Sequence, residues 1–157
     1  MIKKINLTNE IDAFNNNGFV IFDKFLLEEN IEILKNRFDD LFDGKFENTI
    51  EPDEWNWKKN LSDPSATRQI CNVWKSDNLI RKIVCNESIG LIASKLMGWQ
   101  GARLVQDNIL WKPSGGKTLG YHQDASYVDW IVPQTMITCW MSLDQTSQNS
   151  TLEFVKG

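Results

Sequence analysis

The only histidine in the chain, His122, stands two residues before a carboxylate, Asp124. Residues i and i+2 of a β-strand point to the same face, so a strand here would aim both side chains in one direction. An imidazole nitrogen and a carboxylate oxygen placed in this way are two of the three protein ligands of a non-haem Fe(II) facial site. The same spacing also arises by chance. On the His-x-Asp motif alone, a histidine hydrogen-bonded to a nearby carboxylate is the favoured interpretation.

The residues around this pair predict the strands that would have to position it. A strand is expected from residue 103 to 111, with Leu104, Gln106, Asn108 and Leu110 on one face. Further strands are expected at residues 118–124, 135–143 and 151–155, and a turn-rich "KPSGGK" segment separates the first two strands.

The first hundred residues show mainly a helical pattern. Apolar residues at three- and four-residue steps predict helices that begin after Thr8 or Asn9, after Leu27, after Asp77 and before Ile89. Gly18, Gly44 and Gly98 mark three of the expected helix ends. The segments "GFVIFDKF" and "RQICNVW" are expected as strands, and residues 45–66 as a loop. Helices followed by strands indicate an α+β fold, with the helices packed on one side of a β-sandwich or jelly roll.

The composition of the chain excludes several classes of protein. Its 157 residues carry a net charge of −4, which gives no electrostatic reason to expect nucleic acid or an anionic membrane as a partner. We find no signal peptide and no apolar run of the roughly 20 residues that a membrane span needs. The three cysteines are odd in number and lack metal-type spacing, which indicates reduced thiols and a cytoplasmic location.

Beyond the His-x-Asp pair, the chain resembles the phytanoyl-CoA dioxygenase family over nearly its whole length. The features that carry the resemblance occur in the family's order. They are the opening "GFVIFDKF" and the helix after it, Lys112-Pro113 at a strand end, a glycine-bearing loop, His122-Gln123-Asp124 followed by Tyr127, then Pro133, Trp140, Leu143-Asp144 and the closing "TLEFVKG".

The resemblance implies a single domain over residues 1–157, in which N-terminal helices (1–100) pack on the first half of a double-stranded β-helix (101–157). It also implies an oxygenase that uses Fe(II), 2-oxoglutarate and molecular oxygen to hydroxylate a small organic metabolite. Carried over by position, His122 and Asp124 are the metal ligands. Asn108 and Trp140 line the 2-oxoglutarate pocket, although a buried polar group satisfied by neighbouring backbone is the alternative for Asn108. Tyr127 and Trp130 shape the substrate entrance.

The chain also departs from the family pattern. The family has a second ligand histidine and a basic residue for 2-oxoglutarate further downstream, and this chain has neither. We therefore expect an incomplete β-helix, a partial sequence and no turnover by this chain alone. The alternatives are a non-catalytic β-sandwich binding module and a split subunit completed by another chain.

Overall fold

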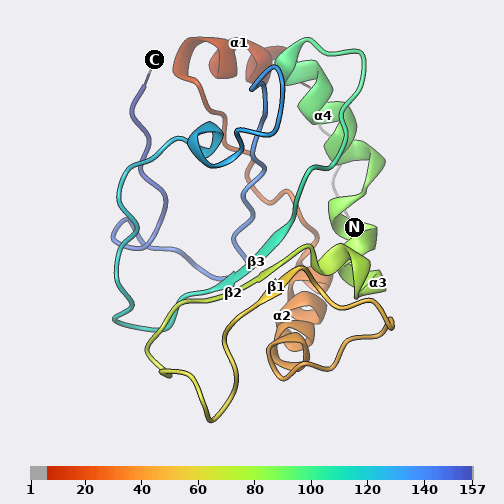
Figure 1. The fold of residues 1–157 in the computed structure, drawn as a ribbon. Helices are drawn as coiled ribbons and strands as arrows, with labels where there is room; N and C mark the ends of the chain where they lie inside the picture. Colours follow the sequence, from red (N-terminus) through yellow and green to blue (C-terminus); the bar gives the residue numbers. More distant parts are fainter. Residues whose placement is uncertain (1–6, 157) are drawn as a thin grey trace.

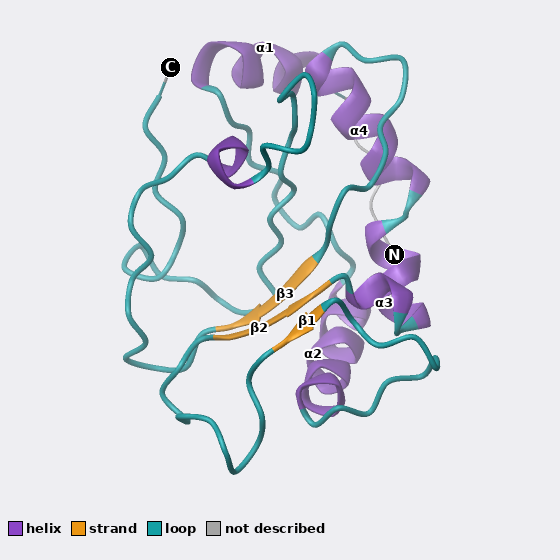
Figure 2. Ribbon diagram, in the orientation of Figure 1, coloured by secondary structure: helices purple, strands orange, loops and turns teal. Residues whose placement is uncertain are grey.

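The computed structural model describes residues 7–156. Within this range there are four α-helices and a three-stranded sheet; the sheet is central, α2, α3 and α4 lie on one side of it, α1 lies across the top, and long loops form the other side (Figures 1 and 2). The architecture is α+β, and the helices precede most of the loop-rich part. The elements are α1 (Thr8–Asn17), α2 (Glu28–Phe42), β1 (Glu54–Trp55), β2 (Arg68–Cys71), the 3₁₀ turn η1 (Val73–Lys75), α3 (Asn78–Val84), α4 (Glu87–Met97), β3 (Asn108–Trp111) and the 3₁₀ turn η2 (Asp124–Tyr127).

All four predicted helices are present, and their ends follow local sequence signals. Gly18 ends α1 in the left-handed conformation (φ 79°), and its N–H donates to Phe14 O. Gly98 ends α4 in the same conformation (φ 66°). The side chain of Asp77 caps α3 as predicted, because it accepts a hydrogen bond from Ile80 N at 2.9 Å. Among residues 7–156, no helix combines the length and the apolar character needed to cross a bilayer.

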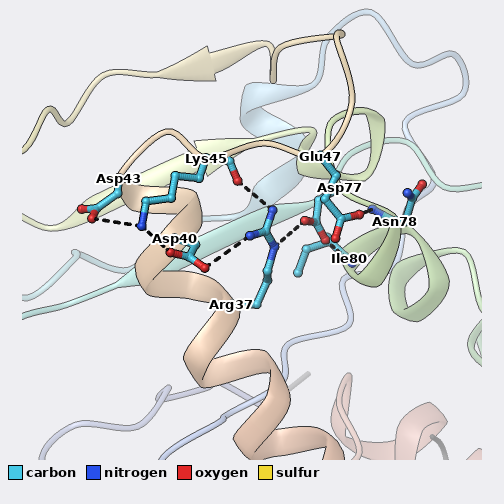
Figure 3. Close-up of polar contacts among 8 residues, drawn as sticks. All are labelled: Arg37, Asp40, Asp43, Lys45, Glu47, Asp77, Asn78 and Ile80. Atoms are coloured by element: carbon cyan, nitrogen blue, oxygen red, sulfur yellow. Dashed lines mark hydrogen bonds and ion pairs between the residues drawn. The ribbon is translucent and has the colours of Figure 1, made fainter.

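A buried ion pair joins the cap of α3 to α2 (Figure 3). Asp77 has no solvent exposure, and its Oδ2 accepts a hydrogen bond from Arg37 Nε at 2.6 Å. The same guanidinium donates to Lys45 O at 2.7 Å and lies 3.6 Å from an oxygen of Asp40. One carboxylate thus satisfies both a helix N-terminus and a largely buried cation, which fixes α3 against α2.

The sheet is antiparallel throughout, in the order β1-β2-β3. Its register pairs Ile70 with Ile109 and Cys71 with Asn108. Ile70 and Ile109 are buried against the helices, whereas Asn108 is exposed on the opposite face of the sheet. This alternation is the period of two that the sequence predicts, although β3 covers only the last four residues of the expected strand at 103–111.

The hydrophobic core lies between the sheet and helices α2 and α3. Met141 and Leu143, from the C-terminal part, pack against its edge. The buried members of this cluster are Leu26, Leu34, Leu41, Phe42, Ile70, Val73, Ile80, Ile83 and Ile109.

Several predicted strands are wrong. Of the described residues after Trp111, none lies in a strand, so residues 118–124, 135–143 and 151–155 run as irregular chain (Figure 2). An alternating sequence supplies a strand's side-chain pattern but not its hydrogen-bonding partner, and here no partner strand lies alongside. "GFVIFDKF" is likewise not a strand, because the chain turns at Asp23 and Lys24, where φ of Lys24 is 52°. The expected loop at 45–66 contains the short strand β1.

Candidate metal centre

The imidazole of His122 is held by one nitrogen and offers the other. Its Nδ1 lies 2.9 Å from Gly120 O, so an Nδ1–H donates to that carbonyl. This hydrogen bond fixes the neutral tautomer that leaves the Nε2 lone pair available to a metal ion. The ring of Tyr127 packs edge-on against the imidazole, with 5.8 Å between the ring centroids.

The carboxylate of Asp124 lies beside the free nitrogen of His122. Its Oδ1 is 3.4 Å from His122 Nε2, and its Oδ2 accepts a hydrogen bond from the hydroxyl of Thr138. The two side chains are 42% and 45% exposed, so solvent and small molecules reach both ligand atoms. The pair therefore points toward one accessible place, as the sequence predicts. Gln123 between them is extended (φ −114°, ψ 126°), so the local backbone is strand-like although η2 begins at Asp124 and no strand forms.

The segment before His122 is tied to the C-terminal part of the chain. The phenol of Tyr121 donates a hydrogen bond to a carboxylate oxygen of Glu153, and this contact raises the pKa of Tyr121. The ring of Phe154 also stacks on Phe19, with 4.7 Å between centroids, next to the C-terminal end of α1 (Figure 1). These two contacts between residues far apart in the sequence thus hold the irregular segments around His122 and Asp124 in place.

Asn108 and Trp140, the two residues expected at the co-substrate pocket, lie apart from these contacts. In Asn108, the side-chain oxygen accepts hydrogen bonds from Gln69 Nε2 at 3.1 Å and from Gln106 Nε2 at 3.2 Å. The partners of this amide are therefore side chains and not backbone groups. Trp140 is 45% exposed. No hydrogen bond or ring contact joins either residue to His122 or Asp124 in the part of the chain that the structure describes.

Of the two residues expected at the substrate entrance, only Tyr127 contacts a ligand residue. Trp130 is 63% exposed and Tyr127 is 75% exposed. Both rings are therefore available to a substrate, and Tyr127 also restricts the imidazole of His122.

The spacing of the pair suits two adjacent positions of one metal ion. Two ligand atoms that each lie about 2.1 Å from an ion at a right angle are roughly 3 Å apart, close to the 3.4 Å between His122 Nε2 and Asp124 Oδ1. Within residues 7–156, no group of three or more histidine, cysteine, aspartate or glutamate side chains is placed to hold a metal. His122 and Asp124 are therefore two candidate ligands, without a third of these types beside them among the described residues.

Sequence reasoning missed Thr138. Its hydrogen bond to Asp124 joins residues 14 apart in the chain, so no local sequence signal indicates it.

The chain is similar to known proteins over most of its length. The family model for phytanoyl-CoA dioxygenase matches residues 14–157. A 2-aminoethylphosphonate dioxygenase from Uncultured bacterium HF130_AEPn_1 is 29% identical over 148 residues, which cover 92% of this chain and 55% of that protein. The chain thus spans about half the length of this curated relative. No solved structure matches the chain significantly. The matched range includes α2, α3 and α4, the sheet and the His122-Asp124 pair, and the chain belongs to the phytanoyl-CoA dioxygenase family.

Proposed function

We propose that the whole protein is an Fe(II)- and 2-oxoglutarate-dependent oxygenase that hydroxylates a small organic metabolite. The fold that goes with this proposal is a double-stranded β-helix, to which β3 and the segments after it contribute. The free cysteines Cys71, Cys85 and Cys139 agree with a reducing compartment, and we place the enzyme in the cytoplasm.

One observation carries the proposal. His122 Nε2 and Asp124 Oδ1 lie 3.4 Å apart, and each of the two side chains is held by a further hydrogen bond on the atom that faces away from the other. A histidine and a carboxylate held in this way are the kinds of ligand that a non-haem Fe(II) site uses. Membership of the phytanoyl-CoA dioxygenase family supports the same proposal.

The residues of this chain would divide the work as follows. His122 and Asp124 would hold Fe(II), which would supply the oxygen chemistry with 2-oxoglutarate as co-substrate. We assign Asn108 and Trp140 to the 2-oxoglutarate pocket, and Tyr127 and Trp130 to the substrate entrance. A second histidine and a basic residue, which the family pattern requires, would come from outside this chain.

Bound Fe(II) would activate molecular oxygen, while 2-oxoglutarate supplies two electrons and is converted to succinate and carbon dioxide. The task of the chain is to orient these reactants and to keep their coordination positions clear. A carboxylate at position 124 fills a position that a halide would otherwise take, which favours hydroxylation over halogenation.

The direct test is succinate formation by the purified full-length protein. We expect conversion of 2-oxoglutarate to succinate that requires both Fe(II) and oxygen, with 2-aminoethylphosphonate, the substrate named for the relative, among the first compounds tested as acceptors. His122→Ala should abolish this conversion. Gln123→Ala is the matched control, because Gln123 lies between the two ligands and its side chain is exposed.

Two outcomes would contradict the proposal. The first is full-length protein that folds but forms no succinate above a no-protein control with any acceptor tested. The second is His122→Ala protein that turns over as fast as the Gln123→Ala control.

A further inference from the structure

The two oxygens of the Asp124 carboxylate have different neighbours. Oδ1 faces His122 Nε2, whereas Oδ2 accepts the hydrogen bond that the Thr138 hydroxyl donates. Thr138 is 14 residues further along the chain, so this contact is tertiary and not a consequence of the turn that contains Asp124. The carboxylate thus has one oxygen already engaged and one oxygen turned toward the other ligand.

We propose that Thr138 is a positioning residue that holds Asp124 Oδ2 and thereby presents Oδ1 alone to the metal. This inference rests on the proposed function of the His-Asp pair. Asp124 is 45% exposed, so packing does little to restrict rotation of its carboxylate. A hydrogen bond to Oδ2 removes that freedom and keeps the second oxygen from taking a further coordination position.

Each of the two proposed ligands is oriented by one hydrogen bond. His122 is oriented by the hydrogen bond from Nδ1 to Gly120 O, and Asp124 by the hydrogen bond from Thr138. Each ligand therefore presents one defined atom, and the coordination positions that a co-substrate and oxygen need stay open. Loss of an outer partner of this kind typically weakens metal binding by about 10–100-fold.

A purely structural role for Thr138 predicts a different result. In that case the hydroxyl would only tie residues 135–143 to η2, and its loss would lower stability without a specific effect on metal affinity. Metal affinity measured beside thermal stability separates the two roles.

The experiment titrates the full-length protein with Co(II) under anaerobic conditions and follows the visible absorption of the bound ion. Thr138→Val removes the hydroxyl at nearly constant shape, and Thr138→Ser restores it. Thr135→Val is the matched control, because Thr135 is an exposed threonine of the same segment. We expect Thr138→Val to weaken Co(II) binding by about 10–100-fold and to alter the absorption of the bound ion. Thr138→Ser and Thr135→Val should bind Co(II) as the wild type does.

Each other outcome is informative. Wild-type protein that binds no Co(II) would overturn the proposed function, and the role of Thr138 with it. Wild-type binding that Thr138→Val leaves unchanged would overturn the role of Thr138 alone. If Thr138→Val fails to fold, Thr138→Ala provides the same measurement. Failure of both to fold would show that the hydroxyl serves the fold and would refute the proposal.

Discussion

Removal of the Asp77 carboxylate should cost this protein more stability than almost any other single polar change. Asp77 is fully buried and serves two partners, Ile80 N at the start of α3 and Arg37 Nε on α2 (Figure 3). Loss of a helix cap costs about 1 kcal/mol. Loss of the carboxylate of a buried ion pair costs about 3–5 kcal/mol, because the other charge is left unpaired.

The guanidinium of Arg37 keeps two other contacts, the hydrogen bond to Lys45 O and the longer ion pair with Asp40. We therefore expect Asp77→Ala to lower the free energy of unfolding by about 4–5 kcal/mol, the lower part of the combined range of about 4–6 kcal/mol. Asp77→Asn keeps an acceptor for Ile80 N but loses both the charge and the acceptor for Arg37 Nε, so its cost should be smaller only by about the 1 kcal/mol of the cap.

Urea unfolding followed by tryptophan fluorescence measures these values. Asp40→Ala is the matched control, because Asp40 pairs with the same guanidinium but its side chain is 45% exposed, and such pairs contribute about 1 kcal/mol or less. An Asp77→Ala protein as stable as the Asp40→Ala protein would refute the reasoning.

Two further predictions concern the same scaffold. In Gly44→Ala, the new Cβ would clash with the Trp55 ring, at a residue whose φ is 81°. The melting temperature of this variant should therefore fall well below that of Gly98→Ala, where φ is 66° but nothing lies within 4 Å of the new Cβ. Equal melting temperatures of the two variants would contradict this. Burial raises the pKa of Asp107, so its contribution to stability is full below the ordinary aspartate pKa of about 3.9 and is lost as pH rises through the raised value. The free energy of unfolding of Asp107→Asn relative to wild type should therefore increase between pH 4 and pH 7, and a difference that stays constant with pH would show that the buried carboxyl does not titrate there.

The helical part of the fold could be predicted because its determinants are local. The spacing of Ile31, Leu34, Phe38 and Leu41 predicts α2, and Asp77 predicts the start of α3. Each of these signals acts within a few residues, so no knowledge of the tertiary structure is needed. The structure of the chain after Trp111 could not be predicted in the same way. The sequence pattern predicts strands there, but a strand forms only where a second strand supplies hydrogen bonds, and the local sequence does not show whether one is present.

The candidate site shows the same limit. Strand geometry predicts the adjacency of His122 and Asp124, and the backbone between them is indeed extended at Gln123, although a 3₁₀ turn begins at Asp124 and no strand forms. The closeness of the two side chains could be predicted from the residue types and their spacing. Their support by Gly120 O and Thr138 could not, because the tertiary contact with Thr138 has no local signature.

The central claim is that His122 and Asp124 hold an Fe(II) ion to which 2-oxoglutarate binds. Fe(II) chelated by 2-oxoglutarate has a visible charge-transfer absorption, so an anaerobic titration of the full-length protein with both compounds reports on this complex directly. We predict that the absorption develops to a saturating level with the wild type and with Gln123→Ala, and that it fails to develop with His122→Ala and with Asp124→Ala. Absorption that is absent from the wild type, or that persists unchanged in both ligand variants, would contradict the account.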